Sequence, residues 1–350
     1  MASTAVIIDG AYGEGGGSVV RTALSVSALT GQPLEIRNVR GGLRRPGIAP
    51  IDTAIANSLG AATRAEVSAR VGDDLLRFTP KQQIQPLRED VDLNELAAGT
   101  QPGSAVLTLQ TIITPLARAG GMSYVSCRGG THIPFSPTYE YFRSVTLPAM
   151  ALVGVVGVSS MSSAGYPPRG GGNVDLEIEP SALNGFEWAS RGDMVQCKAF
   201  VVGSELPDAV LKRGSAHIAN LCKKDSLPMD VETVKPTSKN PGAAVTCIAI
   251  FERGFAGYQA IGERGKPMEI VCEEAYSSLV MWLNGEATVD EFLADQMLIP
   301  AAFSGEKCLY KTNRITPTLT TAAWVIKQFM PAKIAILGKE GQPGDVKIGY

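Results

Sequence analysis

Along the first part of the chain, the spacing between apolar residues changes several times. Short apolar runs, typical of strands, alternate with segments in which apolar residues recur every three or four positions, as in amphipathic helices. The predicted elements are, in order, strand Ala5–Asp9, helix Val19–Leu29, strand Leu34–Val39, helix Ile51–Ser58, strand Glu66–Arg70 and strand Leu75–Thr79. Gly72-Asp73-Asp74 supplies a hairpin turn between the last two strands. The pattern therefore predicts one βαβαββ unit of roughly 80 residues.

Two later stretches show the same order of element types. In the middle of the chain, the pattern predicts helix Ser104–Arg118, strand Met122–Ser126, helix Phe142–Val153 and strand Val174–Ile178. At the end, it predicts helices Ser277–Leu283, Phe292–Ala302 and Thr321–Phe329 with strands Lys333–Leu337 and Val346–Ile348. The repeat lies in the elements rather than in residue identity.

Residues 186 to about 266 interrupt this order. The segments Val195–Val202, Ala209–Leu221, Met229–Val234, Ala244–Phe251 and Phe255–Ala260 form a small α/β pattern of their own. We therefore expect an α/β protein whose large domain, residues 1–184 and 267–350, holds three βαβαββ units. A smaller α/β domain, residues 185–266, is inserted into it.

Composition narrows the class of protein without naming a function. The chain has 350 residues, of which 45% are hydrophobic and 19% charged, with a net charge of −2, as expected for a globular protein without a general affinity for nucleic acid. Its six cysteines contain no C-x-x-C pair, and no signal peptide is evident, so we expect a reducing, cytoplasmic location. The longest apolar run, Leu147–Val158, is too short to cross a membrane.

A glycine-rich junction follows the first predicted strand. In DGAYGEGGGSVVR, residues 9–21, glycines allow the backbone to approach a ligand, and the helix that follows offers free N–H groups to an anion. Glu14 would repel a bare phosphate unless a cation lay between them. The stretch matches neither the dinucleotide fingerprint nor the P-loop. It predicts either a metal–phosphate or nucleotide site, or only a tight strand-to-helix turn.

Other polar stretches interrupt the apolar pattern. RGGLRRPG, residues 40–47, suits an anion clamp because arginine binds phosphate bidentately, although a charged surface loop explains it equally well. RGGTHIPFSP, residues 128–137, contains His132 and precedes aromatic residues on which a base can stack. YPPRGGG, residues 166–172, is another glycine cluster. In EFLADQ, residues 291–296, Asp295 and Gln296 interrupt an apolar helix face, which predicts a ligand or hydrogen-bond partner.

Together these stretches resemble the RNA 3′-terminal phosphate cyclase family over nearly the whole chain. The motifs that carry the resemblance are, in order, DGAYGEGGGSVVRTALSVSALTG, RRPGI, GGTHIPFSPTYEY, GYPPRGGG, GERGKPMEIV and EFLADQMLIP. The resemblance implies three βαβαββ units with a small α/β insert, similar to the enolpyruvyl transferases. The unit count from periodicity agrees with this fold.

The resemblance implies ATP-dependent conversion of an RNA 3′-phosphate to a 2′,3′-cyclic phosphate. A histidine near the C-terminus is first adenylated, the AMP passes to the RNA phosphate, and the 2′-hydroxyl then displaces it. By position, Glu14 would help to hold Mg²⁺ or Mn²⁺, Arg21 and Arg40 would bind phosphates, and Tyr141 would lie near the adenine. The other residues implied in the nucleotide pocket are Gly15, Gly16, Gly17, Pro134, Asp295 and Gln296.

The chain departs from the family pattern where the histidine is expected. In ITPTLTT, residues 315–321, Thr318 stands at that position, and sliding the alignment by one residue places Pro317 there instead. Neither side chain forms a phosphoramidate, and a threonine hydroxyl without a nearby base is a poor nucleophile. His132 is the remaining candidate for a stand-in nucleophile, since His217 lies within the predicted insert.

The phosphate-binding region also departs from the pattern. After RRPG the family usually continues toward Gln-His, where this chain has Ile51-Asp52, and family members often carry arginine at the position of Leu43. Each charge-assisted hydrogen bond lost in this way is worth about 1.5–3 kcal/mol. The sequence therefore keeps the scaffold of the family, while some of the residues that the resemblance implies for phosphate and ribose recognition are replaced.

Three hypotheses follow. The chain is a nucleotide-binding enzyme that cyclises RNA 3′ ends, through His132 or by direct transfer from ATP. Alternatively, the pocket takes another phosphorylated or nucleotide metabolite, or the protein is a non-catalytic cyclase-like factor that binds RNA or serves ribosome assembly. Retention of Glu14, the glycine clusters and Asp295-Gln296 favours a pocket that still binds a nucleotide. The sequence leaves the oligomeric state open.

Overall fold

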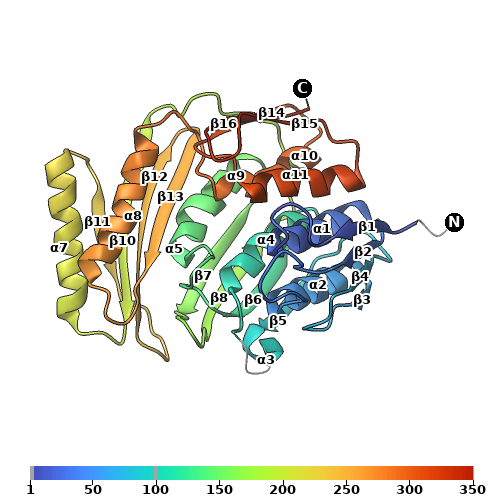
Figure 1. The fold of residues 1–350 in the computed structure, drawn as a ribbon, viewed down its shortest axis with the longest axis horizontal. Coiled ribbons are helices and arrows are strands. Elements are labelled where there is room, and N and C mark those ends of the chain that lie inside the picture. The colour runs from blue at the N-terminus through green and yellow to red at the C-terminus, as the bar shows by residue number, and fades with distance from the viewer. Residues whose placement is uncertain (1–3, 98–100, 350) are drawn as a thin grey trace.

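The computed structural model describes residues 4–97 and 101–349. They form a mixed α/β structure that contains four four-stranded sheets (Figure 1). The first sheet is built from β1 (Val6–Asp9), β2 (Leu34–Arg37), β3 (Glu66–Ser68) and β4 (Leu76–Thr79), in the order β1-β2-β4-β3. The β1–β2 pair is parallel and the other two pairs are antiparallel. Helices α1 (Gly17–Thr30) and α2 (Pro50–Thr63) follow β1 and β2.

The second sheet repeats this arrangement. Its strands are β5 (Arg88–Asp92), β6 (Ser123–Gly129), β7 (Gly157–Ser163) and β8 (Gly172–Ile178), in the order β5-β6-β8-β7. Again the first pair is parallel and the others are antiparallel. The helices between its strands are α3 (Leu93–Ala97), α4 (Ala105–Ala117), α5 (Tyr139–Tyr141), the π-helix η1 (Phe142–Thr146) and α6 (Leu147–Leu152).

The third sheet has the same pairing but draws its strands from both sides of a long insertion. It contains β9 (Phe186–Glu187), β14 (Cys308–Thr312), β15 (Ile334–Leu337) and β16 (Gly344–Ile348), in the order β15-β16-β14-β9. The β9–β14 pair is parallel, and β14–β16 and β15–β16 are antiparallel. Helices α9 (Leu293–Gln296) and α10 (Leu298–Phe303) precede β14, and α11 (Pro317–Phe329) follows it.

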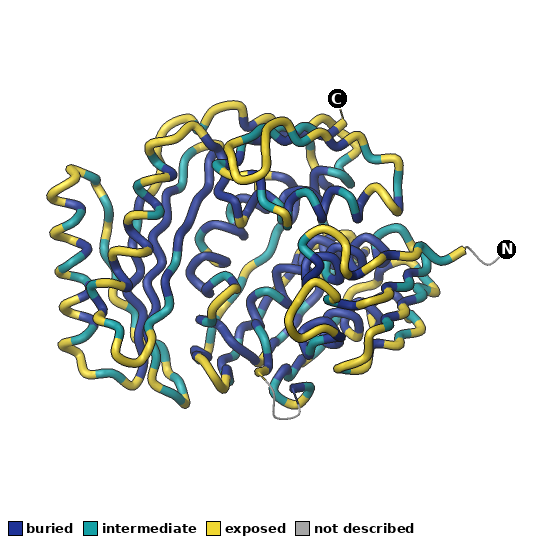
Figure 2. The backbone as a smooth tube through the Cα atoms, viewed as in Figure 1, coloured by how far each residue is buried: buried dark blue, intermediate teal, exposed yellow. Residues whose placement is uncertain are grey.

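The inserted segment forms the fourth sheet. Strands β10 (Met194–Ser204), β11 (Asp230–Val234), β12 (Gly242–Phe251) and β13 (Gly254–Ile261) are arranged β11-β10-β12-β13, with α7 (Asp208–Asp225) and α8 (Met268–Leu283). A second hydrophobic cluster joins this sheet to both helices. The domain boundary at residue 266 stays a prediction. Helix α8, which begins just after that boundary, packs against the sheet of the insert. The outer face of α7 is exposed (Figure 2).

Local sequence explains where the helices that frame the site begin and end. Gly31 ends α1 in the left-handed region, with φ 68°. Pro50 occupies the first turn of α2, where its missing N–H leaves no donor unsatisfied. Ser104 caps α4 and Thr316 caps α11, because each hydroxyl accepts a bond from the backbone N–H three residues later.

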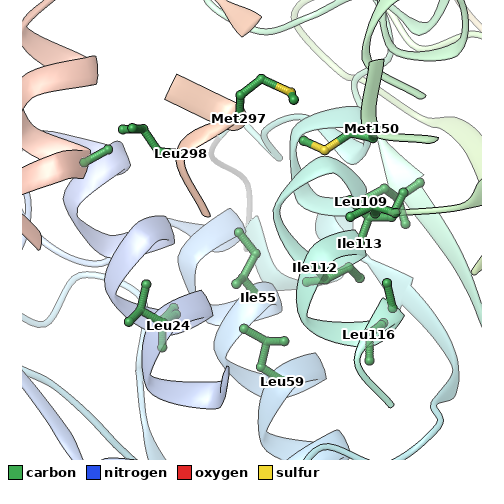
Figure 3. Packing of buried hydrophobic residues seen from close by; sticks show 14 of the residues in the cluster. Leu24, Ile55, Leu59, Leu109, Ile112, Ile113, Leu116, Met150, Met297 and Leu298 are labelled. Carbon is green, nitrogen blue, oxygen red and sulfur yellow. The ribbon is translucent and has the colours of Figure 1, made fainter. Parts of the chain in front are cut away.

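The larger hydrophobic cluster centres on α1, α2 and α4, and α11 packs on α1. Figure 3 shows Leu24 of α1, Ile55 and Leu59 of α2, and Ile112 and Leu116 of α4 within it. All five side chains are fully buried, and each such burial contributes about 1.5–3 kcal/mol. The packing fixes the N-termini of α1 and α11 relative to each other, and these two helix ends frame the site.

The mixed α/β class is confirmed, while several elements differ from the sequence prediction. The helix expected over Phe142–Val153 is continuous with α5 and contains the π-helical turn, and the helix expected over Phe292–Ala302 divides into α9 and α10. The helix expected at Ser277 begins at Met268. Strands β5, β7, β9 and β14 were not predicted. β7 is a serine-rich edge strand without a buried residue, so it shows no apolar alternation.

Candidate functional site

A cleft of about 1110 Å³ opens where the N-termini of α1 and α11, helix α9 and the loop of residues 38–47 meet. The sequence-predicted residues that line it are Glu14, Gly17, Arg21, Arg40, Tyr141, Asp295, Gln296 and Thr318. The glycine-rich junction near the amino end and the Asp295–Gln296 pair near the carboxyl end therefore face one cavity. Gly15, Gly16, Pro134 and His132 do not line this cleft.

The glycines of the junction serve two different purposes. Gly15 has φ 58°, and a β-carbon there would lie 2.7 Å from the Cα of Gly42, whose N–H donates to the Gly15 carbonyl at 2.9 Å. Gly15 therefore packs one loop against another. A β-carbon on Gly17 would meet a guanidinium nitrogen of Arg21 at 2.5 Å and one of Arg40 at 2.8 Å. Gly17 thus leaves space for two cations above the first turn of α1.

Glu14 caps the N-terminus of α1. Its Oε1 accepts a hydrogen bond from the Ser18 N–H at 2.8 Å, so a carboxylate already occupies part of the positive end of the helix. The Glu14 N–H donates to Thr321 Oγ1 at 3.0 Å, and Tyr12 stacks on Trp324 with ring centroids 3.8 Å apart. These contacts tie the junction to α11. An anion at this helix end would therefore lie beside Glu14.

Arg21 is a partly buried cation that, among the residues that the structure describes, has no hydrogen-bond or ion-pair partner. Burial lowers the pKa of Arg21, and the charges of Asp52, Asp295 and Glu14 oppose this effect. A guanidinium removed from water without hydrogen-bond acceptors is unfavourable. A ligand with anionic oxygens would supply those acceptors.

Arg40, by contrast, has a partner. Its Nε and Nη2 donate to the two carboxylate oxygens of buried Asp52 at 2.6 and 2.8 Å. Burial alone would lower the pKa of Arg40, but the hydrogen bonds and the charge of Asp52 raise it. Asp52 also accepts from the Ala49 N–H and so caps α2. Arg40 lines the cleft, but its Nε and Nη2 groups are already hydrogen-bonded to Asp52.

Asp295 lines the same cleft, close enough to Arg21 for their charges to interact, and accepts a hydrogen bond from Gln296 Nε2 at 2.8 Å. Burial raises the pKa of Asp295 to about 6, and the charge of Glu14 adds to this effect. The Gln296 hydrogen bond and the Arg21 charge act in the opposite direction. A carboxylate with this pKa can accept a proton near neutral pH.

Tyr141 presents its ring to the cleft while its hydroxyl is held beneath the surface. The hydroxyl donates to Asp290 Oδ1 at 2.8 Å, and the backbone N–H groups of Gly257 and Leu293 donate to the same carboxylate. Burial raises the pKa of Asp290 to about 7. This buried carboxylate thereby joins α5, β13 and α9 under the cleft.

A family model described as RNA 3′-terminal phosphate cyclase matches residues 12–336, which include all the predicted cleft residues. The chain belongs to this family. A protein of that name from Methylococcus capsulatus is 35% identical over 348 residues, which cover 99% of this chain and 96% of the relative. A second, from Trichormus variabilis, is 34% identical, covering 94% and 95% of the two chains. A third, from Pyrococcus abyssi, is 33% identical, covering 98% of each.

Thr318, which the sequence analysis places at the cyclase histidine position, is the second residue of α11 and lines the cleft. Thr316 caps this helix end by accepting from the Leu319 N–H at 3.1 Å, and Pro317 has no N–H to offer. Within the described residues, no histidine or carboxylate is hydrogen-bonded to the Thr318 hydroxyl. The geometry therefore supplies no base to activate Thr318 as a nucleophile.

His132 is enclosed away from the cleft. Its side chain is fully buried, with Nε2 2.7 Å from Glu140 Oε2 and Nδ1 2.8 Å from Thr131 Oγ1. The ring also stacks on Tyr166, with centroids 5.2 Å apart. Both ring nitrogens are engaged and the ring is inaccessible to a nucleotide. The structure therefore gives no support to His132 as a stand-in nucleophile.

The sequence analysis did not single out several residues that line the cleft. They are Ser18, Leu107, Gln110, Phe135, Gln259, Glu291, Phe292 and Arg314. Ser18, Phe135, Glu291 and Phe292 lie within stretches that the sequence had already marked. Leu107, Gln110, Gln259 and Arg314 carry no local motif, and only tertiary structure brings them to the cleft. The polar partner of Arg40 had a signal, because Asp52 follows Pro50 at the third helical position, where an acidic side chain caps the helix.

Within residues 4–97 and 101–349, no group of three or more histidine, cysteine, aspartate or glutamate side chains is placed to hold a metal ion. The same residues contain no helix with the length and apolar character needed to cross a membrane.

Proposed function

We propose that this cleft binds ATP together with the phosphorylated 3′ end of an RNA, and that the protein converts the 3′-phosphate to a 2′,3′-cyclic phosphate. Unpartnered Arg21 carries this proposal, because its guanidinium requires anionic oxygens and faces a cleft of about 1110 Å³. That volume suits a nucleotide with a second substrate beside it. Family membership supports the same reaction. The proposal includes a three-unit fold similar to the enolpyruvyl transferases, the insert at 185–266 and a cytoplasmic location.

The donor set fits a metal that is shared with phosphate oxygens. Glu14 uses Oε1 to cap α1, and Asp295 lines the same cleft. Mg²⁺ is commonly held by one or two carboxylates plus substrate phosphates, and Mn²⁺ accepts similar oxygen ligands. Glu14 would hold such an ion together with the phosphate oxygens, and the charge of the ion would offset that of the phosphates.

The chemistry proposed here needs no covalent enzyme intermediate. An oxygen of the RNA 3′-phosphate attacks the α-phosphorus of ATP, a P–O bond forms, and pyrophosphate leaves. The neighbouring 2′-hydroxyl then attacks the 3′-phosphorus, and AMP leaves with the electron pair of the broken bond. Asp295 would accept the hydroxyl proton, since its pKa of about 6 allows it to be ionised at neutral pH. Direct transfer is preferred because Thr318 lacks a base and His132 is buried.

Arg21 and Arg40 would mainly bind the substrate phosphates and offset their negative charge. Arg21 would bind the phosphates as they gain charge in the transition state, which is the role of preorganised donors in phosphoryl transfer. Arg40 would contribute charge from its remaining N–H groups while Asp52 fixes its orientation. The ring of Tyr141 would lie near the adenine.

One observation favours a second candidate, namely a different phosphorylated or nucleotide metabolite as substrate. Asp52 occupies the fork of Arg40, so fewer donors remain for an RNA phosphate than an unpaired arginine would provide. A substrate with fewer negative charges would need fewer of these hydrogen-bond donors. No comparable observation favours the non-catalytic alternative.

Two assays test the proposal. A 3′-phosphorylated oligonucleotide is incubated with ATP and Mg²⁺ or Mn²⁺, and cyclic ends are scored by resistance to phosphatase. In parallel, the protein is incubated with ATP labelled on the α-phosphate and examined by denaturing electrophoresis.

Cyclisation without label on the protein is the expected result. Label that survives denaturation would overturn the direct route. Tight ATP binding without cyclisation would favour the metabolite substrate, and absence of any nucleotide binding would favour the non-catalytic alternative.

A further inference from the structure

Phe135 is the most exposed large apolar side chain in the described part of the chain, with an exposed fraction of 103%, and it lines the cleft. A side chain that is fully exposed and still part of the lining stands at the opening of the cleft rather than in its interior. Leu43 and Phe292, which are 41% and 50% exposed, line the same cleft. Exposed apolar surface that gathers at a cleft marks a place where a partner covers it.

The backbone at Phe135 is also unusual. Its φ is 60°, in the left-handed region, where a β-carbon crowds the neighbouring carbonyl oxygen. The other described non-glycine residues with positive φ are polar or charged, namely Asn38, Arg40, Arg64, Glu205 and Ser226. Glycine would adopt this conformation without strain, yet an aromatic residue stands here. Strained positions of this kind cluster at ligand-binding sites.

The loop that carries Phe135 is fixed on both sides of it. His132 and Thr138 are fully buried, and Gln259 of β13 binds the loop twice. Its Nε2 donates to the Ser136 carbonyl, and its Oε1 accepts from the Thr138 N–H at 2.7 Å. The phenyl ring therefore projects from an anchored loop, and a group that stacks on it has little backbone to order.

The surroundings indicate which flat group the ring would meet. Arg21, without a partner among the described residues, requires anionic oxygens in the same cleft. Exposed Arg44 and Arg45 follow Leu43 on the loop that borders the opening, which favours a polyanion there. A ligand that combines several phosphates with flat π-faces is a nucleic acid strand. A small metabolite held at Arg21 would leave the ring at the opening uncovered, whereas a strand passes the opening as it leaves the cleft.

We propose that Phe135 stacks on a base of the RNA strand where the strand leaves the cleft. It is then a specificity-determining residue that favours RNA over a mononucleotide. The inference rests on the proposed function, since it assumes that the RNA 3′ end occupies the cleft. Every base has a π-face, so this contact selects for a polynucleotide and not for a particular sequence.

The first test compares ligands of different length. Calorimetry measures the affinity for a 3′-phosphorylated adenosine mononucleotide, the corresponding trinucleotide, and ATP. The wild type is expected to bind the trinucleotide about tenfold more tightly than the mononucleotide, because a stacked base adds affinity. Phe135→Gly and Phe135→Leu should lose this preference and keep the affinity for ATP, whereas Phe135→Tyr, which keeps the ring, should behave like the wild type.

Thermal denaturation of the same variants separates binding from folding. Phe135→Gly relieves the positive φ, so its melting temperature should not fall although its affinity for the trinucleotide does. Ser226→Gly is the matched control. Ser226 has φ 53° at the C-cap of α7, is exposed and does not line the cleft, so this variant should bind all three ligands like the wild type.

A second measurement locates the stacked base. Trinucleotides that lack the base at one position at a time are compared in the wild type and in Phe135→Gly. Removal of the base that meets the ring should weaken binding to the wild type about tenfold and leave binding to Phe135→Gly unchanged.

Equal trinucleotide affinity in Phe135→Gly and wild type, or no position at which base removal depends on Phe135, would overturn the inference while cyclisation of RNA ends left the proposed function intact. An equal loss of ATP affinity in Phe135→Gly would assign the ring to ATP and overturn it too. Binding of ATP but of neither the mononucleotide nor the trinucleotide by the wild type would overturn both the inference and the proposed function.

Discussion

Arg21 and Arg40 stand side by side above Gly17, yet their surroundings differ. Arg40 and buried Asp52 form a bidentate pair, whereas Arg21 has no hydrogen-bond or ion-pair partner in the described part of the chain. A cation with a fixed protein partner contributes to folding, and one without is available to a ligand. Two arginines that lie beside the same glycine therefore have different roles: Arg40 organises the wall of the cleft, and Arg21 is free to bind an anion.

The most damaging single change is expected at the paired arginine. Asp52→Ala leaves Arg40 without its partner and removes the cap of α2, so the free energy of unfolding should fall by about 4 kcal/mol. Urea denaturation measures the loss. The double variant Arg40→Met/Asp52→Leu replaces the pair with apolar side chains and should recover most of it. A double variant no more stable than Asp52→Ala would contradict a role confined to the ion pair.

The unpartnered arginine should show the opposite behaviour. Arg21→Ala removes no hydrogen bond within the described residues, so stability should be unchanged or rise, whereas affinity for ATP should fall roughly 100-fold because about two charge-assisted hydrogen bonds are lost. Calorimetry with ATP and Mg²⁺, paired with thermal denaturation, separates the two effects. A lower melting temperature with unaltered ATP affinity would show that Arg21 is structural.

Asp295 makes stability depend on pH in a defined direction. Burial raises its pKa to about 6, so between pH about 4 and about 6 the folded protein holds a proton that the unfolded chain has released. Its contribution is most favourable below this range and is lost as the pH rises through about 6. After allowance for partial exposure, Asp295→Asn should be more stable than wild type by about 2 kcal/mol at pH 7.5 and similar to it at pH 4.

Urea denaturation at several pH values measures this difference. Asp74→Asn, a change at an exposed position, serves as the control and should leave the pH profile of the wild type intact. The same profile in Asp295→Asn and wild type would exclude Asp295 as the source of the dependence.

A smaller effect is expected under the cleft. Tyr141→Phe removes the hydroxyl donor to Asp290 while three backbone N–H groups continue to bind that carboxylate. Loss of one hydrogen bond to a buried charge should cost about 1.5 kcal/mol of stability, with ATP affinity little changed because the ring remains. Denaturation and calorimetry on the same preparation test both statements. A large loss of ATP affinity would place the hydroxyl itself in the binding site.

The smallest effect is expected at Thr318. Thr318→Val keeps the shape of the side chain and removes a hydroxyl to which no base in the described part of the chain is hydrogen-bonded, so cyclisation should change less than twofold, within about 0.5 kcal/mol. Phosphatase-resistant ends measured over time provide the rate. A loss of tenfold or more would restore Thr318 to the reaction and remove the case for direct transfer.

Local chemistry in the sequence predicted part of what lines the cleft. Glu14 stands out as a carboxylate among glycines and Asp295 as a polar residue on an apolar helix face, whereas Arg21 was predicted from the family resemblance; all three line one cleft. The α/β class followed from the alternating periods. The ion pair between Arg40 and Asp52 could not be predicted, because it depends on how α2 meets the 38–47 loop. The burial of His132 was equally hidden, since its partner Glu140 lies on a helix whose orientation the sequence does not state.

The N-terminal junction owes its form to the far end of the polypeptide. Glu14 bonds to Thr321, 307 positions later, and Tyr12 stacks on Trp324. During synthesis on the ribosome, the first glycine turn therefore emerges long before the helix that completes it. A nascent or C-terminally truncated chain would lack the wall that α11 provides, so the cleft can form only at the last stage of synthesis.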